Sequence, residues 1–328
     1  MSNPWPSVSV LMPILNEAAG LGEVLGSLRD QDYEGGWEMV AVDGGSRDGT
    51  PAILASWSER LPHLLVLSAP EGRRHLTGSL MLAAETAKGK IVIRADAHTV
   101  YAGDYLRRNV EALLETGADL VGGPMRPEGS DPFGRAVASV MVNRWVVGPA
   151  PYRRVLKRRR ADTVYLGAIR RSRLLQMGLR RFPSGVAEDA DLAYRIRKQG
   201  GEVVLDPAIR SRYRPRATPG ALWRQFYRYG RAKAEMLYAN RELPTLRPLA
   251  PLGLAIALVA TLAAAPWLGW WWALFGLGGW TVYLAVVTGG WPRQLLAAAT
   301  VQLSNGLGIL IGLAAGPGRV SRTLGPPY

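Results

Sequence analysis

Two long stretches near the C-terminus contain no charged residue, and they limit what this chain can fold into more than any other feature. Beyond Glu242 the sequence has no acidic residue, and residues 248–292 and 294–318 carry no charge of either sign. Helices of water-soluble proteins rarely lack charge for so long, and about 20 apolar residues suffice to cross a bilayer. We therefore expect a membrane region over residues 248–317 in preference to a buried helical hairpin.

The uncharged region contains three candidate helices. We expect spans over 249–265 and 271–287, joined by a turn that contains Pro266 and interfacial tryptophans. The third candidate, 294–315, is interrupted by polar side chains, so it is either a third span or an interfacial or re-entrant helix. Two crossings would keep the C-terminal arginines on the side of the preceding domain, and we favour that arrangement slightly. The N-terminus predicts no signal peptide.

The preceding part of the chain, about 240 residues long, alternates between short apolar runs and helical patterns. This alternation predicts βα units and a mainly parallel sheet, hence an α/β fold. Strands are predicted at 7–14, 38–42, 64–67, 90–94 and 119–121, and helices at 16–30, 51–59, 79–88 and 104–115.

Polar residues follow the ends of several predicted strands. They are Asn16 and Glu17 after the first, Asp43 after the second, and Asp96 with His98 after the fourth. Ligands of such sheets gather at the carboxyl ends of the strands. The sequence has neither a G-x-G-x-x-G fingerprint nor a P-loop. The pattern favours a nucleotide whose sugar and base are held by carboxylates and whose phosphates are met by a cation.

The composition narrows the partners. The chain has no cysteine, which excludes disulfides, thiolate metal sites and cysteine nucleophiles. Its formal charge of +14 suits nucleic acid, anionic lipid or phosphorylated substrates. The most basic run, residues 152–160, belongs to no recognisable nucleic-acid-binding module. We expect it to contact membrane lipids or a carrier phosphate, with a solvated loop as the alternative, and we expect no nucleic-acid partner.

Five segments, in order, resemble family 2 glycosyltransferases, which have the GT-A fold. They are VSVLMPILNEAAGLGEVLGSL, MVAVDGGSRDGT, IRADAH, AEDADLAYRIRKQG and WRQFYRYG. The combination is similar to the ExoA-like branch, which builds bacterial exopolysaccharide on a lipid carrier. The resemblance implies a GT-A nucleotide-sugar-binding domain over residues 1–217, followed by the membrane tail.

For the donor site, the resemblance implies that Asp43 contacts the base or ribose of the nucleotide. Glu17 and the backbone of Pro13 should help to hold the base, and Arg73, with Arg74 beside it, falls where the family has a basic loop near the donor. The alternatives are a turn aspartate bonded to its own backbone, a helix N-terminal acid, and a solvated pair of arginines.

The resemblance places a metal ligand at Asp96, the second acid of the family's Asp-x-Asp. Mg²⁺ or Mn²⁺ would neutralise the departing diphosphate. Arg94 stands where the first acid belongs, and His98 is a candidate for a further ligand or a diphosphate contact. Residues 94, 96 and 98 tend to share one face of a strand. The alternative for Asp96 is an ion pair with Arg94.

The resemblance assigns the catalytic base to Asp189, which follows Glu188. Gln225, Arg228 and Tyr229 match the Q-x-x-R-[WY] element and imply contacts with the diphosphate or the acceptor. Glu188 is a further candidate for such a contact. The surrounding segment, 218–242, carries an aromatic stripe and an arginine stripe, which is typical of an amphipathic helix on an anionic membrane.

We therefore expect an inverting glycosyltransferase that moves a hexose from a nucleotide-sugar, UDP-linked in preference, to a lipid-linked saccharide. It should be a multi-pass protein of the inner (plasma) membrane with a cytoplasmic catalytic domain. The alternatives are transfer directly to a polyprenyl phosphate, and a non-catalytic partner in a polysaccharide export complex, for which Arg94 is the best argument.

Overall fold

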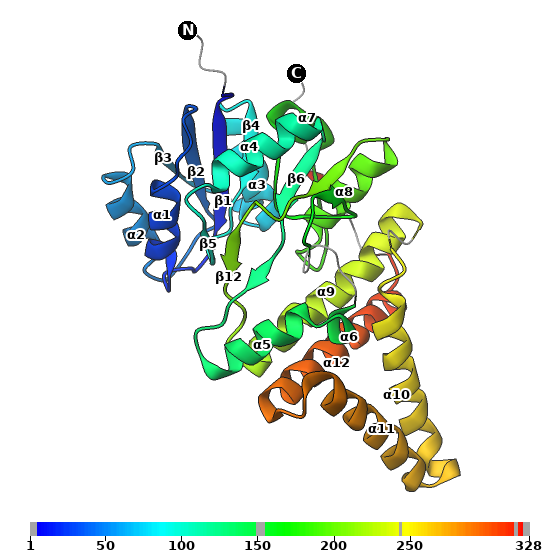
Figure 1. Cartoon of the computed structure of the whole chain (residues 1–328). Coiled ribbons are helices and arrows are strands. Elements are labelled where there is room, and N and C mark those ends of the chain that lie inside the picture. The colour runs from blue at the N-terminus through cyan, green and yellow to red at the C-terminus, as the bar shows by residue number, and fades with distance from the viewer. Residues whose placement is uncertain (1–4, 149–154, 243–244, 318–320, 324–328) are drawn as a thin grey trace.

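The computed structural model describes residues 5–148, 155–242, 245–317 and 321–323. Its N-terminal part is an eight-stranded sheet covered by helices, and its C-terminal part is a group of long helices that extends away from the sheet (Figure 1). The strand order is β3-β2-β1-β4-β9-β6-β11-β8. These strands are β1 (Val8–Ile14), β2 (Trp37–Asp43), β3 (Leu64–Ser68), β4 (Ile91–Arg94), β6 (Leu120–Gly123), β8 (Arg159–Arg160), β9 (Tyr165–Arg170) and β11 (Val203–Leu205).

The sheet is mainly parallel, as the alternation of strands and helices predicts. β1 pairs in parallel with β2 and β4, β2 with β3, and β6 with β11. In the middle of the sheet, β9 runs antiparallel to both β4 and β6, and at the edge β8 runs antiparallel to β11. The carboxyl ends of β1, β2 and β4 therefore lie at one edge, where ligands of such sheets bind.

Two apolar cores lie on opposite faces of the sheet. Val10 and Met12 of β1 belong to one core, and Leu11 between them belongs to the other. This follows from the alternation of side chains along a strand, and a strand covered on both faces is apolar throughout. The first core is covered by α1 (Leu21–Arg29), α2 (Thr50–Ser58) and α4 (Tyr105–Thr116), and the second by α3 (Leu76–Thr86), α7 (Arg171–Met177) and α8 (Glu188–Lys198).

The first helix is shorter than the sequence predicts. It begins at Leu21, because the preceding residues are engaged with the loop after β2. Asn16 has a φ of 55°, and its side-chain oxygen accepts the N–H of Arg47 at 2.9 Å. The Ala18 N–H donates to Asp48 at 3.1 Å. Side chains that bond to a neighbouring backbone compete with helix formation in this way.

Two small sheets complete the N-terminal part. β5 (Thr99–Tyr101), β12 (Ser211–Tyr213) and β7 (Arg126–Pro127) form one, in the order β5-β12-β7. In the other, β10 (Leu179–Arg181) pairs antiparallel with β13 (Ser321–Thr323). Since β13 follows the last long helix, the chain returns to the sheet domain after its apolar region.

Three C-terminal helices are long and apolar enough to cross a membrane: α10 (Leu249–Leu268), α11 (Trp270–Thr288) and α12 (Pro292–Ala314). α10 and α11 form a hairpin that points away from the sheet (Figure 1). The predicted turn at 266–270 is too long, because α10 continues through Pro266 to Leu268 and only Gly269 separates the helices. A proline in the last turn removes few helical hydrogen bonds.

The third apolar helix differs from the other two in its surroundings. Within the 18-residue apolar window of each helix, 56% of α12 is buried, against 17% for α10 and for α11. α12 lies beside α9 (Pro219–Asn240), the helix that follows the sheet domain (Figure 1). The Oγ1 of Thr218 accepts the Ala221 N–H at 3.3 Å and caps α9.

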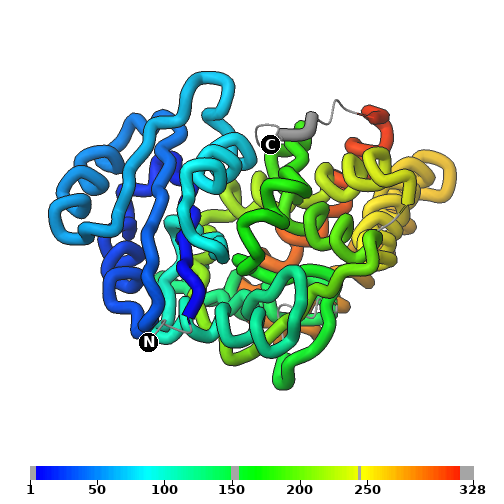
Figure 2. The backbone as a smooth tube through the Cα atoms, turned by 90° about the horizontal axis from the view of Figure 1, so that it is seen from above, coloured from blue at the N-terminus to red at the C-terminus, as the bar shows by residue number. Residues whose placement is uncertain are grey.

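Glycines allow α9 and α12 to approach closely. A Cβ on Gly308 of α12 would lie 2.3 Å from the carbonyl oxygen of Tyr227, and one on Gly230 of α9 would lie 2.2 Å from that of Asn305. Seen from above, the blue-to-cyan first third of the chain lies on one side of the molecule, and α10, in yellow, lies on the other (Figure 2).

Two short helices, α5 (Pro132–Val142) and α6 (Arg144–Val147), also join the sheet domain to the apolar helices. The Asn143 side-chain amide donates to the carbonyl of Val287 at 2.7 Å, and the Tyr283 hydroxyl donates to the carbonyl of Trp145 at 2.6 Å. These hydrogen bonds form a second connection, between the α5–α6 segment and α11, in addition to the contact of α9 with α12.

We expect Gly308→Ala to destabilise the protein by about 1–3 kcal/mol, because the added methyl group would force α9 and α12 apart. Thermal denaturation in detergent measures the effect. Gly278→Ala on α11 is the matched control, since a Cβ there has no atom within 4 Å. A Gly308→Ala protein as stable as the wild type would contradict the close contact.

Candidate active site

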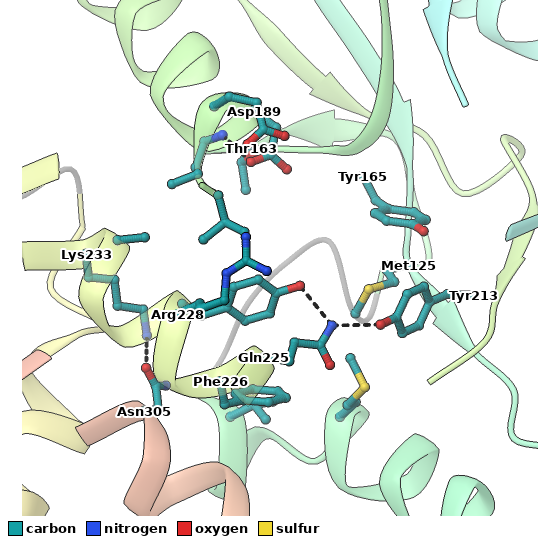
Figure 3. A pocket seen from close by; sticks show the side chains of 18 of the residues that line it. Met125, Thr163, Tyr165, Asp189, Tyr213, Gln225, Phe226, Arg228, Lys233 and Asn305 are labelled. Carbon is teal, nitrogen blue, oxygen red and sulfur yellow. Dashed lines mark hydrogen bonds between the residues drawn. The ribbon is translucent and has the colours of Figure 1, made fainter. Parts of the chain in front are cut away.

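A single cavity of about 1400 Å³ joins the carboxyl edge of the sheet to the apolar helices. Glu17, Asp96 and His98 line it on the side of the sheet, and Asp189 lines it at the start of α8. Its other walls come from α9 to α12 and include Lys233 (Figure 3). The polar strand ends predicted from the sequence thus face a space that reaches the apolar part of the chain.

Arg94 is the central cation on the sheet side of this cavity. Its Nη1 donates to Glu188 at 2.6 Å and its Nε donates to Asp96 at 3.1 Å. Burial disfavours the charge, but the carboxylates of Asp96, Glu188 and Asp189 outweigh burial and hold the pKa of Arg94 well above its usual value. Arg94, which stands at the first position of the Asp-x-Asp motif, therefore links the end of β4 to the start of α8 through two ion pairs.

Glu188 and Asp189 are adjacent in sequence but differ in environment. Glu188 is 4% exposed, and burial raises its pKa, which Arg94 partly opposes. Asp189 is exposed, with Oδ1 accepting the Ala190 N–H at 2.7 Å. The preceding residue, Ala187, has a φ of 82°, a strained conformation for a residue with a Cβ. The turn at Ala187 begins the helix with Glu188 directed inward and Asp189 toward the cavity.

His98 is held on the opposite side by two contacts. Its Nδ1 lies 3.2 Å from Oε1 of Glu17, and its ring meets that of Tyr213 edge to face at 5.5 Å. Glu17 is itself fixed through its backbone N–H, which donates to Thr50 at 2.9 Å. The sequence predicts that Glu17 and His98 both face the ligand, and the structure adds that they contact each other.

A divalent metal ion fits this edge only with ligands from a substrate. The described part of the chain contains no group of three or more histidine or acidic residues arranged around a metal position. Asp96 Oδ1 accepts from Arg94, whereas Oδ2 has no hydrogen-bond partner among the described residues. One free carboxylate oxygen next to a space for a diphosphate suits Mg²⁺ or Mn²⁺, which bind proteins through one or two carboxylates plus substrate phosphates.

Two predicted donor residues do not line the cavity. Asp43 accepts both the N–H and the hydroxyl of Ser46, at 3.0 and 2.6 Å, although its neighbour Gly44 does line the cavity. Arg73, in the short helix η1 (Glu71–Arg73), pairs with Glu85 at 2.5 Å. Asp43 thus bonds within its own turn, and a phosphate would have to replace Glu85 to reach Arg73.

The predicted residues of α9 lie in the cavity wall. The side-chain amide of Gln225 donates to the hydroxyls of Tyr213 and Tyr229 at 2.8 and 3.1 Å, and its Oε1 is buried without a partner among the described residues (Figure 3). Arg228 donates to the carbonyls of Ser184 and Gly185 at 2.9 and 3.3 Å. Arg228 therefore ties α9 to the loop that leads into α8.

The cavity wall also contains polar residues to which the sequence analysis assigns no role. They include Thr163, Arg197, Lys233 and Arg247. Thr163 and Arg247 lie in irregular segments, and Arg197 lies on the second half of α8, so only tertiary folding brings them together. The sequence offers one signal, for Arg247, which is the only charged residue between Glu242 and Arg293.

The basic run at 152–160 is only partly described, since residues 152–154 lie outside the described residues. Arg158 pairs with Glu115 and Asp206, each at 2.6 Å, and Arg160 pairs with Glu202. Arg158 and Arg160 are therefore neutralised by the sheet domain, whereas Arg159 donates to the carbonyl of Arg160.

Comparison with known proteins gives a consistent relationship. A family model described as Glycosyl transferase family 2 matches residues 9–177. The succinoglycan biosynthesis protein ExoA of Rhizobium meliloti is 31% identical over 83% of this chain and 84% of its own length. An undecaprenyl-phosphate 4-deoxy-4-formamido-L-arabinose transferase of Aeromonas hydrophila is 33% identical over 42% of this chain and 43% of its own length.

A solved structure shares the fold over nearly the whole chain. The mannosyltransferase PcManGT of Pyrobaculum calidifontis, in complex with GDP-Man and Mn²⁺, matches with a TM-score of 0.63 and 25% identity, covering 93% of this chain and 90% of that one. The GT-A fold and the C-terminal apolar helices predicted from the sequence are thereby confirmed.

We expect Arg94→Met to destabilise the protein by about 3–5 kcal/mol, because Glu188 would stay buried without its counter-charge. The loss of Arg94 would raise the pKa of Glu188 further. The folded state would then hold a proton that the unfolded state releases, so stability would fall as pH rises above the ordinary pKa of glutamate. The deficit relative to the wild type should be larger at about pH 8 than at about pH 5.

Thermal denaturation of wild type and variant at both pH values tests this expectation. Arg94→Met combined with Glu188→Gln is the matched control, because it removes both charges and should recover part of the stability. A deficit that does not change with pH, and is not relieved in the double variant, would exclude the ion pair as its cause.

Proposed function

Because the chain belongs to glycosyltransferase family 2, we propose that it is an inverting enzyme that transfers a hexose from a nucleotide-sugar to a hydroxyl of a lipid-linked saccharide. The product would be an exopolysaccharide or envelope-glycan precursor, in keeping with the likeness to ExoA. UDP is the first nucleotide to test, and GDP the second, because PcManGT was solved with GDP-Man.

The cavity is the observation that carries this proposal. It exposes the carboxylates of Asp96 and Asp189 at one end and is lined by Leu254 of α10 and Trp280 of α11 at the other. A water-soluble acceptor would need no such apolar wall. An acceptor that consists of sugar and lipid would place its sugar at the carboxylates and its lipid along the apolar helices.

Asp189 is the proposed base. A single displacement requires the acceptor hydroxyl to lose its proton as it attacks the sugar carbon, and a carboxylate within hydrogen-bond reach accepts that proton. Asp189 faces the cavity, and its Oδ2 has no hydrogen-bond partner in the described part of the chain. Glu188, buried against Arg94, would position the helix that carries Asp189.

The donor would lie along the edge formed by Pro13, Glu17 and Asp96. Asp43 would reach the nucleotide through its second carboxylate oxygen, and His98 would contact the diphosphate or a metal ion. A divalent ion bound by Asp96 and the diphosphate would neutralise the leaving group.

Gln225, Arg228 and Tyr229 would form the acceptor side of the cavity. The contact of Arg73 with the donor stays a prediction, because a phosphate could reach Arg73 only by displacing Glu85.

We place the sheet domain, residues 1–217, in the cytoplasm, helix 218–242 on the surface of the inner membrane, and 248–317 in the bilayer. The pairing of β13 with β10 favours two crossings, by α10 and α11. α12 would lie in the interface beside α9, in agreement with its greater burial. Arg247 and Arg293 then both lie on the cytoplasmic side, as basic residues flanking membrane spans usually do.

We expect Asp189→Asn to lower kcat for sugar transfer by about 10²–10⁴-fold with little change in donor affinity, because the amide keeps the shape but cannot accept the proton. The assay measures transfer and nucleotide release from UDP-, GDP- and dTDP-sugars in detergent with Mn²⁺, Mg²⁺ or EDTA. Asp119→Asn is the matched control, since this carboxylate pairs with Arg173 and does not line the cavity. Full activity of Asp189→Asn would exclude it as the base.

Single cysteines test the topology, because the natural chain has none. In sealed vesicles a membrane-impermeant maleimide should label Ala315→Cys from the same side as Ser56→Cys on the sheet domain, and Trp267→Cys from the opposite side. All three positions are exposed in the structure. Labelling of Ala315→Cys together with Trp267→Cys would instead establish three crossings.

A further inference from the structure

Two further arginines line the cavity, Arg197 on the second half of α8 and Arg247 just before α10, together with Thr163, which adjoins the Asp162 partner of Arg247. We call these three residues the second cationic region. We propose that these three residues bind the diphosphate of a polyprenyl-diphosphate-linked acceptor, whose hydrocarbon chain passes along α10. The inference rests on the proposed function and extends it, because it names how the carrier is attached to its saccharide and where that linkage binds.

Arg197 is the strongest indication of an anion at this position. It is partly buried, and it has neither an acidic partner nor a hydrogen bond among the described residues; Nε is buried and unpartnered. Its Cζ atom lies 6.0 Å from the centre of the Tyr194 ring, a cation–π contact. Burial lowers the pKa of Arg197. A guanidinium that has lost water without gaining a carboxylate is a ready ligand for phosphate oxygens.

Arg247 and Thr163 complete this region. Arg247 pairs with Asp162, whose Oδ1 is buried without a hydrogen bond in the described part of the chain. The Thr163 hydroxyl is likewise buried and unpartnered there. The Asp162 charge is matched by Arg247, so the positive charge of Arg197 is left over for a ligand. The hydroxyl of Thr163 supplies a further donor.

Apolar side chains from α10, which begins after Arg247, and from α9 also line the cavity. They are Ala250, Pro251 and Leu254 of α10 and Met236 of α9. Arg247 lies just before α10 enters the proposed bilayer, so the cationic region stands at the height of lipid headgroups. A diphosphate at Arg197 and Arg247 would thus be followed by a hydrocarbon chain that descends beside α10.

The position of Arg197 on α8, relative to Asp189, distinguishes two kinds of acceptor. Asp189 and Arg197 are eight residues apart on one helix, which separates them by about 12 Å along the axis. A polyprenyl phosphate that attacks the donor through its own phosphate would hold that phosphate at Asp189. A phosphate at Arg197 instead leaves room for a short saccharide between the carrier and the base. The geometry therefore favours a saccharide acceptor over direct transfer to the carrier.

Neighbouring cations do not offer the same site. Lys198 pairs with Glu242 at 2.6 Å, and this pair does not line the cavity. Lys233 lines the cavity, but its ammonium donates to Asn305 at 3.0 Å. Lys198 is therefore a suitable control for the charge of this helix end.

Binding of farnesyl diphosphate tests the subsite without turnover. The purified full-length protein in detergent, with UDP and Mg²⁺ present to fill the donor site, is compared with Arg197→Gln, Arg197→Lys and Lys198→Gln by native mass spectrometry or calorimetry. We expect Arg197→Gln to weaken binding by about tenfold or more, the usual effect of a lost hydrogen bond to a charged group. Arg197→Lys should retain part of the affinity, and Lys198→Gln should match the wild type.

Inorganic diphosphate and farnesol separate the two halves of the ligand. We expect each to bind more weakly than farnesyl diphosphate. The affinity for inorganic diphosphate should depend on Arg197, as that for farnesyl diphosphate does, whereas the affinity for farnesol should not. In transfer assays, Arg197→Gln should raise the KM for a lipid-diphosphate-linked acceptor and leave kcat and donor hydrolysis unchanged.

Equal binding of farnesyl diphosphate by wild type and Arg197→Gln would overturn the subsite, as would an equal loss in Lys198→Gln. Failure of the proposed function would look different. Neither protein would then release nucleotide from any donor, while the comparison of diphosphate binding would still give its own result.

Discussion

The close approach of α9 and α12 joins the sheet domain to the apolar helices. Backbone atoms meet at Gly230 and Gly308, where neither helix has a side chain to hold them apart. This contact sets the distance between the sheet and the apolar helices that line the same cavity. With the proposed lipid-linked acceptor this distance would matter, because an error of about 1 Å in the reacting geometry can cost about a hundredfold in rate.

The charge pattern of the site explains how an arginine can replace an acid of the metal motif. Several carboxylates converge where β4 meets α8, and without a permanent cation they would repel one another in a partly buried space. Arg94 supplies that cation and joins Asp96 to Glu188. In the proposed reaction, a metal ion that binds with the nucleotide would have less negative charge to neutralise from the protein. The edge would then be organised before the donor binds.

Features that depend on local sequence patterns could be predicted, whereas contacts that depend on tertiary packing could not. The alternation of strands and helices predicted the sheet, and uncharged runs predicted the three apolar helices within a few residues. Acids at strand ends located Asp96 and Glu17. The partner of Arg94 could not be found in this way, because Glu188 lies 94 residues further along the chain. No local pattern assigns a role to Arg197, although it lies in a segment that resembles the family, or to Thr163. Asn16 lies outside the helix predicted for it, because its side chain bonds to the loop after β2.

The pairing of β13 with β10 also orders the events of biosynthesis. β10 is made before the apolar helices, but its partner strand comes from residues 321–323, near the very end of the chain. The sheet domain can therefore form before the apolar helices are synthesised, whereas this edge of β10 stays unpaired until β13 has been made. If α10 and α11 enter a membrane as proposed, the small sheet would form only after their insertion, and until then its open edge would be exposed to other chains.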